Sequence, residues 1–278
     1  MSRKQILPQI LLLVFLLPAF EASSQSEEVL LAPVKTGGKF GYYGYIDKTG
    51  KIVVEPQFDD ARDFNEGLAL IQMGDKYGYI NKTGKMVVEP QFHDARDFNE
   101  GLAPIQLGSK WGYIDKTGKI VIQPQFDEAE NFQEGLAVIN LGGRYGYIDK
   151  TGEIAIHLPF YNAPQFEGAR DFHEGLASIK LRGGWGYIDK TGKMVIKPQF
   201  DEAWSFNEGL ALIRMDYANS KYGYIDKTGS TVIEPQFDDA KYFQEGLARI
   251  KLDDKWGYID KTGEIVIKPQ FDWAGYFH

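Results

Sequence analysis

The sequence predicts an all-β protein built from seven tandem copies of one three-stranded unit. The string Gly-Tyr-Ile-Asp/Asn-Lys-Thr-Gly begins at seven glycines, 34 residues apart at four of the six intervals. An apolar triplet, Pro-Gln-Phe, an alanine and a second phenylalanine follow in each copy, and six copies close with Glu-Gly-Leu-Ala. Self-similarity at a fixed period of this length is typical of repeat architectures. The seven glycines are Gly44, Gly78, Gly112, Gly146, Gly186, Gly223 and Gly257.

Three apolar segments separated by turn residues predict the three strands of a unit. In the copy that starts at Gly67 they are residues 68–72, 77–80 and 85–89. The tetrad at 81–84 begins with Asn and ends with Gly, which suits a type I turn finishing in a left-handed residue. We therefore interpret the seven tetrads as hairpin turns, with a calcium or phosphate site as the alternative.

The segment after the third strand carries the phenylalanines. Proline cannot donate a ladder hydrogen bond, so Pro90 is expected to end the third strand. Phe92, Ala95 and Phe98 recur at spacing three, which suits one tight helical turn or a bulged short strand. The strands are apolar on both faces, so neighbouring sheets must stack and the rings should fill the gap between them.

The ends of the chain bear on whether the units form a ring or a rod. Residues 31–34 align with 102–105, so the chain holds a whole number of units, seven, when counted from Leu31. A rod needs polar caps, whereas the last repeat is as apolar as the others and adds Trp273. We predict a closed seven-bladed β-propeller-like ring. An open β-solenoid is the alternative, because 34 residues is short for a four-stranded blade.

The N-terminal segment has the layout of a secretory signal peptide. Arg3 and Lys4 precede an apolar run at 10–17, and small residues follow, including Ala22 and Ser24. We predict a signal peptide over 1–24 with cleavage after Ser24, a linker at 25–30 and the repeat domain at 31–278. A buried helix or membrane anchor is the alternative. The mature chain is expected to be secreted or periplasmic, without a membrane span.

Composition narrows the chemistry. The absence of Cys excludes disulfides and thiolate metal sites, and a net charge of −8 disfavours nucleic acid and anionic membranes as partners. No two of the four histidines lie at metal-ligand spacing. Acidic pairs such as Asp59-Asp60 recur with the unit, which indicates turn or solvated residues and not the catalytic pair of a glycosidase. We therefore expect a monomer with no catalytic residues, no metal and no cofactor. The histidines are His93, His157, His173 and His278.

The Tyr/Trp-Gly-Tyr-Ile-Asp-Lys-Thr-Gly string, together with Glu-Gly-Leu-Ala, resembles the bacterial WG-repeat family over residues 29–278. Trp111, Trp185 and Trp256 stand in literal Trp-Gly pairs, and the other copies carry Tyr. The resemblance implies a secreted or envelope-associated binding module. Residues 108–118 also look like the aromatic hairpins of choline-binding and other cell-wall-binding repeats.

The aromatic residue before each repeat glycine is the predicted contact residue, as a stacking surface for sugar rings or quaternary ammonium groups. The alternative is that these rings pack between units as core. Insertions at 157–162 and 216–220 break the repeat and are further contact points. The predicted residues are Tyr43, Tyr77, Trp111, Tyr145, Trp185, Tyr222 and Trp256.

These observations predict a non-enzymatic exported binding or scaffold module that engages a protein partner in the envelope or outside the cell. One alternative is binding of carbohydrate or cell-wall glycan through the repeated Trp and Tyr. A hydrolase or lyase on a propeller is a further alternative, by analogy of fold only.

Overall fold

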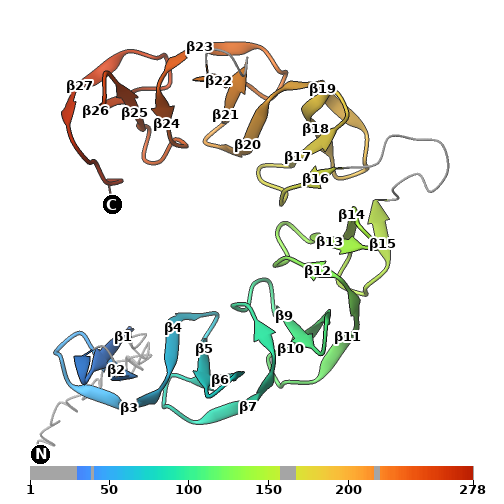
Figure 1. The fold of residues 1–278 in the computed structure, drawn as a ribbon, viewed down its shortest axis with the longest axis vertical. Helices are drawn as coiled ribbons and strands as arrows, with labels where there is room; N and C mark the ends of the chain where they lie inside the picture. Colours follow the sequence, from blue (N-terminus) through green and yellow to red (C-terminus); the bar gives the residue numbers. More distant parts are fainter. Residues whose placement is uncertain (1–29, 39–40, 157–166, 216–219, 278) are drawn as a thin grey trace, which may run out of the picture.

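The computed structural model describes residues 30–38, 41–156, 167–215 and 220–277. These residues form seven antiparallel sheets that follow one another along an arc (Figure 1). The all-β architecture and the seven units predicted from the sequence are confirmed. The signal peptide, the linker up to residue 29, and the insertions at 157–162 and 216–219 lie outside the described residues.

The first sheet has three strands and the other six have four, in sequence order across each sheet. The first sheet contains β1 (Leu31–Thr36), β2 (Tyr42–Asp47) and β3 (Ile52–Phe58). The second contains β4 (Asp60–Asn65), β5 (Leu68–Met73), β6 (Lys76–Asn81) and β7 (Met86–Phe92). The third contains β8 (Asp94–Ala95), β9 (Leu102–Leu107), β10 (Lys110–Asp115) and β11 (Ile120–Phe126). The fourth contains β12 (Glu128–Ala129), β13 (Ala137–Leu141), β14 (Arg144–Ile148) and β15 (Ile154–Ile156).

The remaining three sheets repeat the same order of strands. The fifth contains β16 (Gly168–Ala169), β17 (Leu176–Leu181), β18 (Gly184–Asp189) and β19 (Met194–Phe200). The sixth contains β20 (Glu202–Asn207), β21 (Leu210–Met215), β22 (Lys221–Ile225) and β23 (Thr231–Phe237). The seventh contains β24 (Asp239–Ala240), β25 (Ala248–Leu252), β26 (Lys255–Ile259) and β27 (Ile265–Phe271).

The segment with the phenylalanines forms a fourth strand, so the prediction of three strands per unit was one strand short. This strand lies on the inside of the arc, as β12 and β16 show, whereas β11 and β27 run along the outside (Figure 1). It is a short strand and not a helical turn: β8 pairs with β9 at Asp94 and Ala95, and the equivalent strand β4 is bulged between Ala61 and Phe64. In four of the six four-stranded sheets this strand has only two residues, which leave almost no periodic signal in a sequence.

Proline does not end the outer strand, contrary to the prediction. The strand β7 continues through Pro90 to Phe92, where it pairs with Tyr77 across a bulge. The strand β7 is at the edge of its sheet, and Pro90 lies in the bulge between the pairs Tyr77–Phe92 and Tyr79–Val88, where a strand tolerates proline.

A buried tyrosine on the third strand of each four-stranded sheet, and on the second strand of the first sheet, holds the following inner segment. The Tyr79 hydroxyl donates to the backbone carbonyl of Arg96 at 2.7 Å, and its ring packs against Phe98 with centroids 4.8 Å apart. All seven units make this hydrogen bond at 2.6–2.8 Å. Burial raises the pKa of Tyr79, so the hydroxyl stays protonated and remains a donor.

Two glycines of the repeat string are required by close backbone approach. A Cβ on Gly78 would lie 2.5 Å from the carbonyl oxygen of Val88 on the neighbouring strand. Gly84 adopts a φ of 79°, and a Cβ there would lie 2.9 Å from a methyl group of Val54 in the preceding sheet. The turn glycine therefore serves both the hairpin and the packing between sheets.

The tetrad is a hairpin turn, as predicted. Asn81 Oδ1 accepts hydrogen bonds from the Thr83 N–H at 3.0 Å, the Thr83 hydroxyl at 2.7 Å and the Lys85 N–H at 3.0 Å. Where the first residue is aspartate, the acceptor of these hydrogen bonds is a charged carboxylate. At Asp47 the hydrogen bond from Thr49 holds the pKa of the carboxyl below its ordinary value.

The ring predicted from the sequence is open in this structure. The first and last sheets stand apart at the two ends of the arc (Figure 1). The last sheet accordingly exposes side chains that are buried at the equivalent place elsewhere. Phe271 is 43% exposed, whereas Phe237, one repeat earlier, is 2% exposed. Trp273 beside it is 78% exposed.

These two phenylalanines give a matched test of the open arc. We expect Phe237→Ala to lower the free energy of unfolding by about 3–5 kcal/mol, because it empties a filled junction. Phe271→Ala should cost roughly 1 kcal/mol or less, since its ring is already half in water. Urea denaturation followed by circular dichroism measures both. Equal losses would mean that Phe271 is buried in solution and that the ring closes.

Candidate binding surface

The seven aromatic residues predicted as contact sites lie one per sheet, at equivalent places, and the structure does not bring them together. Trp111 and Trp185 are each 7% exposed, within core clusters that span neighbouring sheets. A guanidinium group lies over each ring, at 5.3 Å for Arg96 over Trp111 and 4.7 Å for Arg170 over Trp185. At these two positions the alternative of core packing fits the geometry better than a stacking surface.

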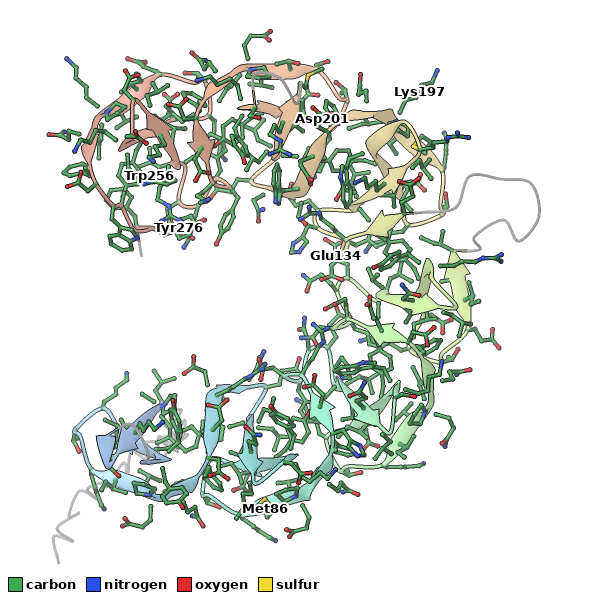
Figure 2. The ribbon with its side chains drawn as sticks, in the orientation of Figure 1. Met86, Glu134, Lys197, Asp201, Trp256 and Tyr276 are labelled. Carbon is green, nitrogen blue, oxygen red and sulfur yellow. The ribbon has the colours of Figure 1, made fainter. Side chains whose placement is uncertain are left out.

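Two adjacent residues on the inside of the arc vary between the repeats. In each unit the alanine and phenylalanine around the inner strand recur, but the two residues between them change. Figure 2 shows Tyr276, one of these residues, at the edge of the last sheet that faces the inside of the arc. We call these residues the inner edge: Arg62-Asp63, Arg96-Asp97, Glu130-Asn131, Arg170-Asp171, Trp204-Ser205, Lys241-Tyr242 and Gly275-Tyr276.

Ion pairs connect the inner edge from sheet to sheet. Arg62 Nη1 lies 3.6 Å from Asp97 Oδ2, and Arg96 Nη1 lies 2.5 Å from Glu130 Oε2. Arg170 Nη2 reaches Glu202 Oε2 of the next sheet at 3.4 Å. Such partly exposed pairs contribute about 0–1 kcal/mol each to stability. The charges are therefore available to a partner at little cost to the fold.

A cavity of about 590 Å³ opens at the junction between the sheets β20–β23 and β24–β27. Trp204 stands there at the repeat position that Arg62, Arg96 and Arg170 occupy elsewhere, so no arginine from this position spans the junction. Three aromatic side chains line the cavity: Trp204, Tyr222 and Tyr242. Among the predicted contact residues, Tyr222 is thus the one placed in this cavity.

Burial perturbs several inner-edge groups. Burial raises the pKa of Asp171 to about 6, and the charge of Arg96 offsets part of that rise. Asp171 Oδ1 is buried and accepts no hydrogen bond from the described residues. Burial also raises the pKa of Asp97 and lowers the pKa of Arg170. Perturbed groups in a concave region indicate a functional surface.

The histidines separate into structural and surface positions. His93 Nδ1 accepts the Gly108 N–H at 3.1 Å, the role that the Asp59 carboxylate fills for Gly74 in the preceding unit. His173 lies at the cavity, and His157 and His278 lie outside the described residues. Within the described ranges, no group of three or more His, Cys, Asp and Glu could hold a metal ion, and no helix is long and apolar enough to cross a membrane.

The inner edge was missed in the sequence because its segment was treated as a packing segment between sheets. Its signal is nevertheless present when the seven units are compared. Trp204, Lys241 and Tyr242 replace an Arg-Asp pair found three times, and two of these replacements are aromatic. Residues that break a repeat on one face are typical of a binding surface.

The titration of Asp171 gives a test of inner-edge burial. The folded chain binds this proton more tightly than the unfolded chain, whose Asp pKa is about 3.9, so ionisation between about pH 4 and pH 6 lowers stability. The native chain should therefore lose about 2 kcal/mol of unfolding free energy between pH 4 and pH 7, relative to Asp171→Asn, which has no carboxyl group to ionise. Urea denaturation at both pH values measures this. Asp63→Asn, at the equivalent exposed position, is the control, and an equal loss relative to it would contradict the assignment.

The chain matches the model of the WG containing repeat at residues 43–77, 77–111, 111–145, 145–185, 185–217, 222–256 and 256–278. No curated protein sequence matches it. Among solved structures, it is similar to BamB from Moraxella catarrhalis, with a TM-score of 0.52, 10% identity, and coverage of 88% of this chain and 86% of that chain.

A eukaryotic initiation factor is similar at a TM-score of 0.57 and 11% identity, over 87% of this chain and 74% of that chain. Both are β-propeller proteins, and at such identities the likeness shows the fold alone. The seven repeat matches together cover nearly all of the residues from 43 to 278. The chain therefore belongs to the WG containing repeat family.

Proposed function

We propose that the chain is a non-enzymatic binding module that acts after export, in the envelope or outside the cell, and engages a protein partner through the inner edge of the arc. The observation that carries this proposal is the contrast between constant and variable positions. The Asp/Asn-Lys-Thr-Gly turns, the buried tyrosines and the phenylalanines recur in every unit, whereas the inner edge changes from Arg-Asp to Trp-Ser, Lys-Tyr and Gly-Tyr. A constant scaffold with variable side chains on one concave edge is the arrangement that repeat proteins use for recognition.

The chemistry of the inner edge supports a protein partner with charges of both signs. Arg62, Arg96 and Arg170 supply cations, and Asp97 and Asp171 supply carboxylates beside them. Such alternation favours a partner with complementary charges and disfavours a polyanion such as nucleic acid. Export rests on the N-terminal sequence alone.

The proposed role predicts that binding depends on the inner-edge arginines and not on total charge. We expect the triple variant Arg62→Ser/Arg96→Ser/Arg170→Ser to lose at least tenfold in affinity for its partner, because three charged contacts are removed. Partners are captured from an envelope extract of the source cells, identified by mass spectrometry, and their affinity for the purified chain is measured by biolayer interferometry.

A matched control removes three exposed lysines from the turns: Lys85→Ser/Lys119→Ser/Lys193→Ser. It changes the net charge by the same amount and leaves the inner edge intact. The control should bind like the native chain. Equal losses in both variants would show that net charge, and not the inner edge, governs binding.

A second ligand class, carbohydrate, is favoured by one specific feature, the aromatic cavity at Trp204.

A further inference from the structure

The cavity exists because one inner-edge position departs from the repeat. At the preceding junction, Arg170 reaches Glu202 and also lies over Trp204, with its guanidinium 5.4 Å from the ring centroid. At the next junction Trp204 itself occupies the arginine's position, and it carries no charge to pair with the sheet β24–β27. The volume of about 590 Å³ left there lies within the range of small-molecule sites.

From this cavity we infer that the chain binds a neutral saccharide between the sheets β20–β23 and β24–β27, with Trp204 and Tyr242 as its stacking residues. This inference rests on the binding role proposed above and gives that role a ligand class. It differs from stacking on the seven repeated aromatics, because Trp204 and Tyr242 belong to the inner edge.

The aromatic walls are held in place before a ligand arrives. Trp204 and Tyr222 form a tilted pair with ring centroids 5.7 Å apart. Tyr242, 43% exposed, stacks on Tyr276 with centroids 4.7 Å apart and an interplanar angle of 20°. The Arg249 guanidinium carbon lies 3.8 Å from the centroid of Tyr276. A ring fixed in this way loses little conformational freedom on binding.

The charges within the cavity favour a neutral ligand. Asp239 Oδ1 and Lys241 Nζ are 3.0 Å apart, so the carboxylate and the ammonium group compensate each other. An anion would face Asp239, and a quaternary ammonium group would face Lys241. Ser205 and Asn207 add uncharged hydrogen-bonding groups to the lining.

A pyranose ring matches this combination. It presents C–H groups on one face, which pack on an aromatic ring, and hydroxyl groups at its edge, which can both donate and accept. A wholly apolar ligand would desolvate Asp239 and Lys241 without replacing their hydrogen bonds with water, which is costly. An extended peptide is the other possible occupant and is included in the test as a competitor.

The test is calorimetric titration of the chain with four uncharged oligosaccharides: chitohexaose, cellohexaose, maltohexaose and xylohexaose. We expect at least one to bind, and Trp204→Arg to weaken that binding at least tenfold. Arginine is the residue that three other units carry at this position, so the variant keeps the repeat pattern and fills the cavity. Tyr242→Ala should weaken binding as well, because it removes the second wall.

Trp273→Ala is the control, since it removes an exposed tryptophan from the last sheet outside the cavity. Its binding should match that of the native chain, and thermal melting checks that each variant is folded. Absence of binding by all four sugars, or unchanged binding by Trp204→Arg, would overturn the inference. The sugar titrations are repeated with a peptide of the protein partner present. If Trp204→Arg weakens binding of that peptide and leaves sugar binding unchanged, the cavity holds a peptide and the inference is overturned.

The two proposals fail separately. If no sugar binds but the inner-edge arginine variant still loses its protein partner, only the saccharide assignment is wrong. If sugar binding depends on Trp204 while the arginine variant keeps every protein partner, the protein-binding role is wrong and the saccharide site remains.

Discussion

The hydrogen bond from a buried tyrosine hydroxyl to the next inner segment is the contact on which the rest of the structure depends. Each of the seven tyrosines combines complete or nearly complete burial with one satisfied polar group. Burial of the ring supplies the hydrophobic contact with the phenylalanine, and the hydroxyl fixes the register of the following segment. Because the acceptor is a backbone carbonyl, the side chain on that residue is left free to vary.

A second contact joins successive sheets at five junctions, through a glutamate of the Glu-Gly turn. Glu208 Oε2 accepts the Gly246 N–H of the next sheet at 3.0 Å and lies 2.9 Å from Lys261 Nζ in the turn of that sheet. The hydrogen bond from Lys261 lowers the pKa of Glu208, so the bridge is ionised at neutral pH. Glu208 adopts a φ of 52°, a conformation that costs about 1 kcal/mol or more for a residue with a side chain. The bridge across the junction offsets that strain.

The sequence was most informative where the chemistry is local. The repeat, the long strands and the hairpin turns follow from short apolar runs and from Asp, Asn and Gly at fixed offsets between them. Glu208 in the Glu-Gly-Leu-Ala string could not be recognised as a bridge, because its partners lie in another unit. The short inner strand was missed for a similar reason, since its pairing is decided by the sheet that receives it.

The candidate site was harder to predict because burial cannot be read from strands that are apolar on both faces. Trp111 and Tyr222 occupy the same repeat position, yet Trp111 is covered by Arg96 and Tyr222 lines a cavity. The difference arises at the inner edge, where the unit of Trp111 carries Arg96 and the unit of Tyr222 carries Trp204. At these two positions, the residue 15 or 18 places earlier in the chain thus decides whether the aromatic ring is covered or lines a cavity.

Separation of scaffold and surface explains how one repeat tolerates such different inner edges. Lys241 and Gly275 occupy the same place in successive units, and Gly275 has no side chain at all. The tyrosine hydrogen bond to the Lys241 carbonyl measures 2.7 Å, and that to the Gly275 carbonyl measures 2.6 Å. The tyrosine hydrogen bond therefore keeps its length when the side chain on the acceptor residue is removed completely. An exposed ion pair at this edge adds about 0–1 kcal/mol, so exchanging arginine for tryptophan costs the fold little and changes the surface greatly.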